Sequence, residues 1–518
     1  MSAAKMGTGV EFTMPKFASR RHPAFALGLL LALATAPLIS QKAARNRALA
    51  RELDHALANP EFQRGFWGVY VYSLDHARVV YNHNADQYFL PASNAKLFTL
   101  AAALHLLGAD YRFHTTVESA APPDAAGLIA GDVRLVGSGD PSFGGRPYPY
   151  REPPASGVPY DMMAAPRALA QQLKARGVTK ISGDVVGDDS YFSDDPYPPG
   201  WAIGDELWDY GAPVNALTVN DNTQYLILTP GAAAGDPVTE TFDPPLAPPA
   251  SVDIATTTAA GTATRLHLVE QDPLRGVPIQ VVGTMPVGAP PVIEALAVRQ
   301  PALYAAQLLR AALVEAGITV TGTARVDRPP QPAQVSQFSL AAWDSPPLAQ
   351  ILQATAKLSQ NLEAEMLLRL LGKLRGTAGT TAAGVAVRGG FLHDAGLGDE
   401  DASLVDGSGL SRTDLVTPAG VARLLEYMAR QPEHEIFLSL LPVAATDGTL
   451  AHRFVSTGAA GRIHAKTGSL SHVNSLSGYV TTERGEHLVF SILSNNVNRP
   501  AAATRNQIDH LATLIAKY

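Results

Sequence analysis

Three short motifs, separated by long stretches of chain, constrain this sequence most. Ser93 stands three residues before Lys96, Ser359-Gln360-Asn361 follows far downstream, and Lys466-Thr467-Gly468 comes last. Each motif alone arises easily by chance, but all three in this order, each in a fitting local context, are hard to obtain by accident. Because Ser359 lies 266 positions after Ser93, a fold that joins the motifs in one site must accommodate a long insertion between them.

Both ends of the chain contain runs that can share one sheet. Alternating and β-branched residues predict strands, and capping and apolar periodicity predict helices. The expected helices are residues 43–57, 92–107 and 501–518, and the expected strands are residues 66–74, 79–82, 462–467, 476–482 and 487–494. We therefore predict an α/β (α+β) domain, in which helices flank one antiparallel sheet and the helix that carries Ser93 packs on that sheet.

The middle of the chain has a different texture. Residues 113–340 are rich in Pro, Gly, Thr and Val, with short β-like runs and Pro-rich loops. One helical stretch, residues 302–316, interrupts the β pattern. We predict two nested β-rich domains here, inserted into a discontinuous domain of residues 41–112 and 341–518. Such an insertion requires that the two cut ends of the host domain lie close together on its surface.

The N-terminus is typical of an export signal. Arg20 and Arg21 precede an apolar run at residues 23–39, which is short for a membrane span of about 20 residues. We expect residues 1–40 to be removed as a signal peptide, which leaves a periplasmic protein without a stable membrane span. Retention of this segment would instead keep the protein associated with the membrane.

Composition excludes several classes of function. The net charge of the chain is −7, and without residues 1–40 it becomes −10, so electrostatics gives no reason to expect nucleic acid as a partner. Cysteine is absent, which removes disulfides, thiolate metal sites and thiol nucleophiles. The chain also lacks G-x-S-x-G, H-E-x-x-H and G-x-x-x-x-G-K-[ST] patterns, so it shows no α/β-hydrolase elbow, zinc protease motif or nucleotide loop.

The first motif can make a serine nucleophile. A hydroxyl attacks well only after a neighbour has taken its proton, and Lys96 lies on the same helical face as Ser93. Lys96 must be neutral to act as a base, and burial or a second cation would lower its pKa; Lys466 is our candidate for that cation. The backbone N–H of Ser93, at a helix N-terminus, suits an oxyanion. In isolation, an N-capping serine beside an exposed lysine would be the better interpretation.

The other two motifs can complete such a site. Ser359 can relay a proton to a leaving group and the amide of Asn361 can hold a substrate amide, although capping of the neighbouring helices is an alternative role for both. Lys466, Thr467 and Ser469 could bind a carboxylate. Gly468 would let a substrate backbone approach, and the Ser469 N–H is the natural second oxyanion donor.

Some polar residues fit local structure better than chemistry. His464 is expected to lie on a strand face, and the segments at residues 406–409 and 447–449 are interpreted as turns. We assign no catalytic role to any of them.

With these motifs placed, the chain resembles the low-molecular-weight class C penicillin-binding proteins, which are D-alanyl-D-alanine carboxypeptidases and endopeptidases of penicillin-binding protein 4 type. The likeness covers nearly all of the chain that follows residue 40. It also includes the segments at residues 137–141, 183–190, 210–213, 406–411 and 447–450. Gln360 departs from the broader superfamily, which often has Asp or Asn there.

The resemblance implies roles for the motif residues. Ser93 would form the acyl-enzyme, Lys96 would be its base and Ser359 the proton relay, while Asn361, Lys466, Thr467 and Ser469 would bind substrate. Family members of this type cleave peptidoglycan stem peptides and bind β-lactam antibiotics, and they need no cofactor or metal.

The resemblance also suggests a recognition pair and leaves two alternatives. Some members of the family recognise the free end of a diaminopimelate side chain with an acid and a tyrosine, which Asp205 and Tyr210 could supply here. A serine β-lactamase would need a group for fast deacylation, and no class A pattern for one is present. A non-catalytic cell-wall scaffold would not need intact motifs.

Overall fold

The computed structural model describes residues 44–154, 157–246, 252–254, 257–258, 263–270, 279–328 and 338–518. The predicted signal peptide, residues 1–40, lies outside these ranges. Residues 44–57 are helical, as expected. Residues 44–51 and the residues from Glu52 onward belong to two separate compact units, and the description below concerns the second. No helix in the described ranges combines the length and the apolar character that a membrane crossing requires.

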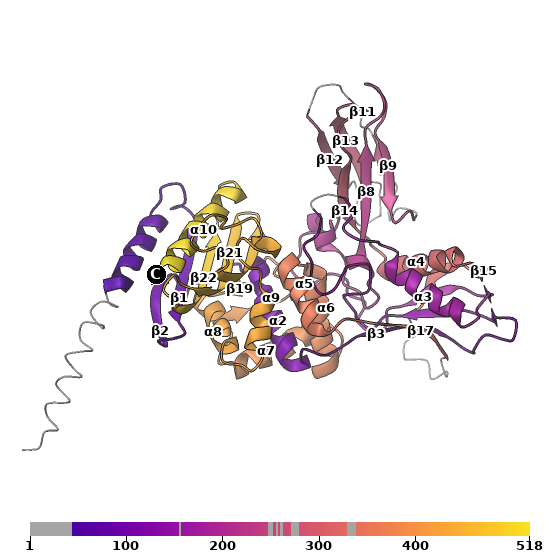
Figure 1. Cartoon of the computed structure of the whole chain (residues 1–518), viewed down its shortest axis with the longest axis horizontal. Helices are drawn as coiled ribbons and strands as arrows, with labels where there is room; N and C mark the ends of the chain where they lie inside the picture. Colours follow the sequence, from indigo (N-terminus) through magenta and orange to yellow (C-terminus); the bar gives the residue numbers. More distant parts are fainter. Residues whose placement is uncertain are drawn as a thin grey trace, which may run out of the picture. The chain divides into compact units, whose positions relative to one another are not determined.

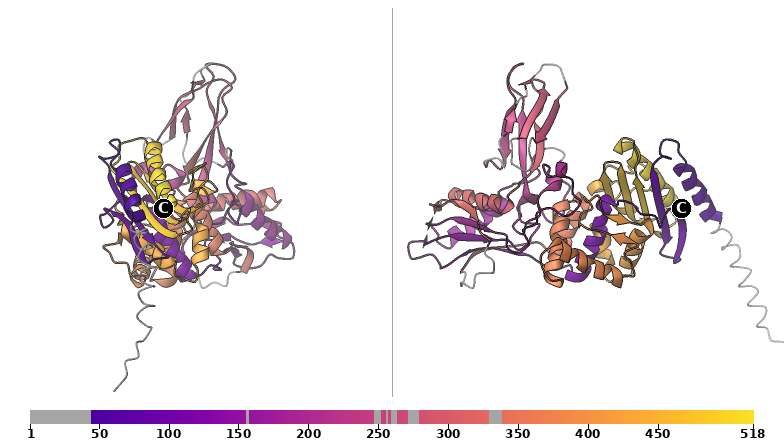
Figure 2. Two further views of the ribbon diagram at one scale, coloured as in Figure 1. Left: turned by 60° about the vertical axis from the view of Figure 1, so that its left-hand side comes forward. Right: turned by 180° about the vertical axis from the view of Figure 1, so that it is seen from behind.

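Strands from both ends of the chain form one antiparallel sheet, as predicted. The order is β2-β1-β22-β21-β20, with every neighbouring pair antiparallel. These strands are β1 (Phe66–Ser73), β2 (Arg78–His83), β20 (Ile463–Leu470), β21 (Val473–Thr481) and β22 (His487–Asn495). Figure 1 shows the yellow C-terminal strands beside the indigo β1, and Figure 2 shows the same sheet from behind. Strand β20 is therefore an edge strand.

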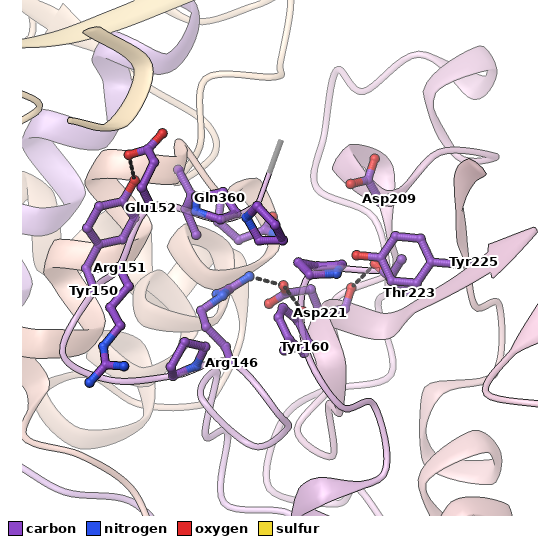
Figure 3. A pocket seen from close by; sticks show the side chains of 15 residues that line it. Arg146, Tyr150, Arg151, Glu152, Tyr160, Asp209, Asp221, Thr223, Tyr225 and Gln360 are labelled. Carbon is purple, nitrogen blue, oxygen red and sulfur yellow. Dashed lines mark hydrogen bonds and ion pairs between the residues drawn. The ribbon is translucent and has the colours of Figure 1, made fainter. Parts of the chain in front are cut away.

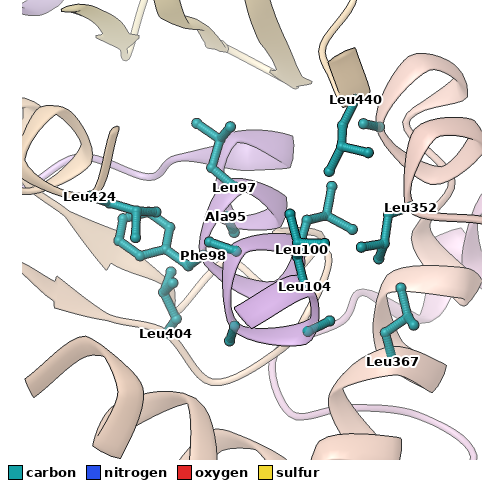
Figure 4. Packing of buried hydrophobic residues seen from close by; sticks show 14 of the residues in the cluster. Ala95, Leu97, Phe98, Leu100, Leu104, Leu352, Leu367, Leu404, Leu424 and Leu440 are labelled. Atoms are coloured by element: carbon teal, nitrogen blue, oxygen red, sulfur yellow. The ribbon is translucent and has the colours of Figure 1, made fainter. Parts of the chain in front are cut away.

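Helices surround the segment that carries the first motif. That segment is a short 3-10 turn, η1 (Ala92–Asn94), followed by α2 (Ala95–Leu107), whose first ten residues are all buried. The helices around it and over the sheet are α5 (Leu348–Leu358), α6 (Asn361–Arg375), α7 (Thr381–Asp394), α8 (Pro418–Met428), α9 (His434–Leu440) and α10 (Ala501–Lys517). Leucines from several of these elements pack against α2 (Figure 4). Because apolar residues encircle α2, its start is held rigidly.

The middle of the chain folds into several smaller sheets. One sheet has the order β16-β7-β5-β3-β17, a second β15-β6-β4, a third β14-β8-β9, and a fourth contains β10 to β13. Their bounds are β3 (His114–Ser119), β4 (Leu128–Ile129), β5 (Val133–Val136), β6 (Lys180–Ile181), β7 (Val185–Asp188), β8 (Thr223–Thr229), β9 (Thr239–Asp243), β10 (Val252–Ile254), β11 (Thr257–Thr258), β12 (Arg265–Glu270), β13 (Ile279–Met285), β14 (Val292–Ala297), β15 (Thr319–Val320), β16 (Ala324–Val326) and β17 (Phe338–Asp344). The short strands β18 (Ala402–Ser403) and β19 (Leu415–Val416) pair separately.

The middle region differs from expectation in two respects. The helix predicted at residues 302–316 is present as α4 (Pro301–Glu315), but a second helix, α3 (Ala164–Ala175), was not predicted. Leu169 and Leu173 of α3 are spaced as on one helical face and are fully buried. The predicted boundary between residues 340 and 341 falls inside β17, which pairs with β3. The division into a host domain and nested inserted domains stays a prediction.

Candidate active site

The first motif brings a serine and a lysine into contact. Lys96 Nζ lies 3.0 Å from Ser93 Oγ, because η1 and α2 continue one helical path and place the two residues on one face. Ala92, directly before the serine, has a positive φ of 48°. Such a backbone conformation is uncommon for a residue with a Cβ and is often retained at functional sites.

Lys96 is completely buried and has two further partners. Its Nζ donates to Asn361 Oδ1 at 2.6 Å and to the carbonyl oxygen of Ser408 at 2.8 Å. A neutral amine has two N–H groups and one lone pair, so these two acceptors leave the lone pair for the Ser93 hydroxyl proton. Burial lowers the pKa of Lys96 to about 7, while the carboxylates of Asp406 and Glu365 act in the opposite direction.

The second motif lies at the break between α5 and α6. Ser359 ends α5 in the left-handed conformation, with φ 63°, and Asn361 is the first residue of α6. The capping role falls to Gln360, whose side chain accepts from the backbone N–H of Leu362 at 3.3 Å. The side chains of Ser359 and Asn361 are therefore available for the contacts with the two lysines.

Lys466, on β20, binds the serine of the second motif. Its Nζ donates to Ser359 Oγ at 2.7 Å and to the carbonyl oxygen of Thr467 at 3.0 Å. The side chain is fully buried, and burial lowers its pKa well below the ordinary value, followed by repulsion from the charge of Lys96. We expected Lys466 to be the cation that keeps Lys96 neutral. The structure instead attributes the low Lys96 pKa first to burial.

The outer edge of β20 carries the remaining residues of the third motif. Ala465 donates its N–H to Pro442, away from β21, and N–H and C=O groups alternate between the two sides of an antiparallel strand. The N–H of Ser469 therefore points to the same free edge. A cavity of about 300 Å³ borders Thr467 and Ser469, and Asn474 of β21 and Arg505 of α10 also line it.

Close packing requires a glycine at position 468, which the sequence alone did not reveal. A Cβ at this position would lie 2.2 Å from Ser475 Oγ and 2.9 Å from the backbone nitrogen of Ser93. Glycine therefore lets β20 approach η1 closely. This contact keeps the N–H groups of Ser93 and Ser469 in one site.

The expected recognition pair, Asp205 and Tyr210, also lies beside the motifs. The Tyr210 hydroxyl donates to Asp205 Oδ1 at 3.2 Å, and burial followed by this carboxylate raises the pKa of Tyr210 to about 12. The carbonyl oxygen of Tyr210 accepts from Asn361 Nδ2 at 2.8 Å. Trp201, upstream in the same segment, donates to Asp406 Oδ2 at 3.0 Å. The segment of Trp201, Asp205 and Tyr210 is thus hydrogen-bonded to Asn361 and to Asp406, two residues that surround Lys96.

A loop to which we assigned no catalytic role supports Lys96. Ser408, whose carbonyl accepts from Lys96, donates its N–H to Glu365 Oε1 at 2.8 Å, and Gly407 donates to the same carboxylate. Asp406 accepts from the N–H groups of Gly409 and Ser411, as in a tight turn. The turn interpretation was therefore sound, but the buried carboxylates that hold the loop were missed. Two acids in the apolar run of α6 were the available signal.

His464 behaves as a strand residue. It lies on β20, forms a bridge with Val443 and makes no hydrogen bond to any of the motif residues in the described part of the chain. Burial lowers its pKa, which is the expected direction for an imidazole partly shielded from water.

Comparisons with known proteins agree with this geometry. The D-Ala-D-Ala carboxypeptidase 3 (S13) family model matches residues 49–518. A D-alanyl-D-alanine carboxypeptidase of Actinomadura sp. (strain R39) is 35% identical over 505 residues, which cover 95% of this chain and 89% of the relative. The D-alanyl-D-alanine carboxypeptidase DacB of Haemophilus influenzae is 29% identical over 426 residues, which cover 81% and 83%.

A solved structure shares the fold. The crystal structure of penicillin binding protein 4 (dacB) from Haemophilus influenzae matches with a TM-score of 0.74 and 25% identity, covering 90% of this chain and 99% of that one. This match confirms the predicted fold class. The family match confirms the resemblance to the class C penicillin-binding proteins. Since the family model spans the chain almost from its first described residues to its C-terminus, the protein belongs to the D-Ala-D-Ala carboxypeptidase 3 (S13) family.

Proposed function

We propose that Ser93 is the nucleophile of a serine D-alanyl-D-alanine carboxypeptidase that acts on peptidoglycan stem peptides. The single observation that carries this proposal is the position of Lys96 Nζ, 3.0 Å from Ser93 Oγ with its other two hydrogen-bonding positions occupied. An amine held in this way, with a pKa lowered to about 7, can accept the serine proton near neutral pH.

Acylation then proceeds with a balanced transfer of one proton. Ser93 Oγ forms a bond to the carbonyl carbon of the penultimate D-Ala, and its proton passes to Lys96. The N–H groups of Ser93 and Ser469 would hold the oxyanion. When the C–N bond breaks, Ser359 delivers a proton to the leaving amine. The proton that Lys96 took from Ser93 replaces it by way of Lys466, which accepts one proton and passes one to Ser359. Water completes hydrolysis by releasing the acyl group as a carboxylate and returning the proton to Ser93.

The remaining motif residues would position the substrate. The hydroxyl-bearing residues Thr467 and Ser469 border one cavity, the amide of Asn361 contacts Lys96, and Lys466 would add N–H groups for the terminal carboxylate. Asp205 and Tyr210 are our proposed contacts for the amine-bearing side chain of the stem peptide, supported by the bond between the Tyr210 carbonyl and Asn361.

We extend the proposal to cross-bridge cleavage, β-lactam binding and export. A D-Ala–diaminopimelate bridge presents the same carbonyl to Ser93, and the name of the Haemophilus relative, penicillin binding protein 4, supports penicillin as an acylating ligand. The N-terminal pattern of residues 1–40 supports export to the periplasm.

The substitution Ser93→Ala tests the assignment. We expect loss of covalent labelling by a fluorescent penicillin and loss of D-Ala release, with the fold retained apart from about 1 kcal/mol if the hydroxyl also caps the helix. Full labelling of this variant would overturn the assignment. Hydrolysis of penicillin at tens of turnovers per second by the native protein would instead favour the β-lactamase alternative. No acid in the described part of the chain is hydrogen-bonded to Ser93, which favours a long-lived adduct.

A further inference from the structure

A second cavity adjoins the motif Ser359-Gln360-Asn361. Its volume is about 380 Å³, which lies within the range of small-molecule sites. The walls come from residues 146–154 and 159–160, from Asp209, from the chain leading into β8 and from the turn between α5 and α6 (Figure 3). Leu358 and Gln360, the residues directly before and after Ser359, both line it.

Hydrogen bonds and ion pairs fasten the walls of this cavity to the reaction site. Arg146 pairs with both Glu363 of α6 and Asp221. On the other side, Glu152 accepts from the Tyr150 hydroxyl at 2.6 Å and from the N–H of Gly448 at 3.0 Å. The cavity therefore keeps a fixed position relative to Ser359.

The loop that contains Gly448 also contacts the third motif. Thr467 Oγ1 donates to Thr449 Oγ1 at 2.9 Å. The cavity is thus next to Ser359 through Leu358 and Gln360, and its wall is linked to Thr467 through the loop of Gly448 and Thr449. Ser359 is the group that would protonate the leaving amine, so we take this as the side that receives the leaving group. This step rests on the proposed function, because it takes Ser359 as the group that protonates the leaving amine.

We propose that this cavity binds the second stem peptide of a cross-linked peptidoglycan dimer. In the carboxypeptidase reaction the leaving group is a single D-Ala, which would leave most of a 380 Å³ cavity empty. In cross-bridge cleavage the leaving amine belongs to a diamino acid that carries a second stem peptide. That larger leaving group has a chain of amides and carboxylates to place beyond Ser359.

The lining chemistry fits such a peptide. Tyr160 and Tyr225 present aromatic rings, prolines supply further flat apolar surface, and Gln360 offers an amide. Arg151 lines the cavity with an exposed side chain that forms no ion pair with any residue in the described ranges, so it is available for a carboxylate. Because Glu152, Asp209 and Asp221 also line the cavity beside Arg146, the combination is suited to an extended peptide that carries both amine and carboxylate groups.

The test compares two substrates on the same variants. Tyr225→Ala removes one aromatic wall and Arg151→Glu reverses the charge at the rim. For each, kcat/KM is measured for D-Ala release from a monomeric pentapeptide and for cleavage of a cross-linked muropeptide dimer. We expect the dimer value to fall about fivefold or more, mainly through KM, while the pentapeptide value and penicillin acylation change by less than about twofold.

Matched controls separate the cavity from general effects. Tyr225→Phe keeps the ring and should retain most dimer cleavage, and Arg484→Glu makes the same charge change in the exposed turn between β21 and β22 and should change neither substrate. Equal losses on both substrates, or no loss on either, would overturn the cavity assignment. A native protein that releases D-Ala but does not cleave the dimer would also overturn it while leaving the proposed carboxypeptidase function intact.

Discussion

The surroundings of Lys96 and of Lys466 differ, although the two side chains are equally buried. Both have no exposed surface, and each Nζ contacts a serine hydroxyl. Lys96, however, lies near several carboxyl groups, including those of Asp406 and Glu365, whose charges favour its ammonium form. The pKa of Lys466 is lowered by burial and then by the charge of Lys96, and no carboxyl group in the described ranges offsets these effects to a comparable extent.

This difference separates the two amines by function. Desolvation alone would push the pKa of both lysines far down, and the nearby acids return that of Lys96 to about 7. An amine with such a pKa can both accept and release a proton at neutral pH, as a general base must. Burial lowers the pKa of Lys466 without compensation from nearby acids, and its contact with Ser359 suits hydrogen bonding and the transfer of a proton between the two groups.

The largest expected effect is that of Lys96→Met. This substitution keeps a long side chain of similar volume but removes the base, so we expect penicillin acylation to fall about 10⁴-fold, the upper end for acid–base catalysis. Labelling rates with a fluorescent penicillin would measure the loss, and near-UV circular dichroism would check the fold. Acylation close to the native rate would show that Lys96 is not the base.

Lys466→Met should have a smaller effect of a different kind. We expect acylation to fall about 10²-fold, because the relay through Ser359 loses its partner while the base remains. The acidic limb of the pH–rate profile should stay near pH 7, since burial and not Lys466 sets the Lys96 pKa. A shift of this limb to higher pH by about one unit or more would restore Lys466 as the cation that keeps Lys96 neutral.

The sequence predicted the sheet, the Ser93 helix and the meeting of the three motifs. These succeeded because strand alternation, helix capping and apolar periodicity are local signals. It could also suggest burial of Lys96, since α2 is apolar on all sides. What it could not supply was the distribution of charge around each lysine. Glu365 and Asp406 reach Lys96 only after α6 and the following loop have packed beside α2.

Other differences have equally specific causes. The approach of a substrate backbone at Gly468 stays a prediction, and the structure adds a second reason for glycine, since a Cβ would meet Ser475 and the backbone of Ser93. That contact joins residues 375 positions apart, which no local pattern encodes. By contrast, α3 was missed although Leu169 and Leu173 showed helical spacing. The Pro- and Gly-rich composition of the surrounding residues favoured loops and strands, and the helical spacing of two leucines was too short a signal to change that prediction.

The pH dependence of the free energy of unfolding offers a third test of the difference between Lys96 and Lys466. Because burial holds the pKa of Lys466 well below its ordinary value, the folded state binds this proton less readily than the unfolded state, which costs free energy of folding at neutral pH. Because the unfolded state binds more protons at every pH between the lowered pKa and 10.5, stability rises with pH over that window.

Lys466→Met should remove this cost and raise the free energy of unfolding at pH 7 by roughly 1–2 kcal/mol, after the loss of the bonds to Ser359 and Thr467. The gain should shrink as the pH approaches 10. Urea unfolding at pH 7 and pH 9.5 would measure both. A gain that is equal at the two pH values would mean that the effect comes from packing and not from protonation.

The smallest expected effect concerns the acids near Lys96, where Glu365→Gln and Asp414→Asn form a matched pair. Burial raises the pKa of Glu365 to about 7 and that of Asp414 to about 9, so Glu365 is partly ionised at the acidic limb while Asp414 is protonated. Both carboxyl groups accept from backbone N–H groups, of Ser408 and Val405 respectively. Both substitutions therefore make a similar structural change.

A charge on Glu365 favours the Lys96 ammonium form more than one on Asp414 does, and at the acidic limb Glu365 is the one of the two that is partly ionised. Loss of that charge in Glu365→Gln should lower the Lys96 pKa and move the acidic limb of penicillin acylation to lower pH by about half a unit. Asp414→Asn replaces a group that is already neutral at that pH and should leave the limb in place. Equal shifts in the two variants would point to loosening of the loop. A shift of the acidic limb to higher pH in Glu365→Gln would contradict the comparison. It would mean that the nearby acids do not raise the pKa of Lys96 above that of Lys466.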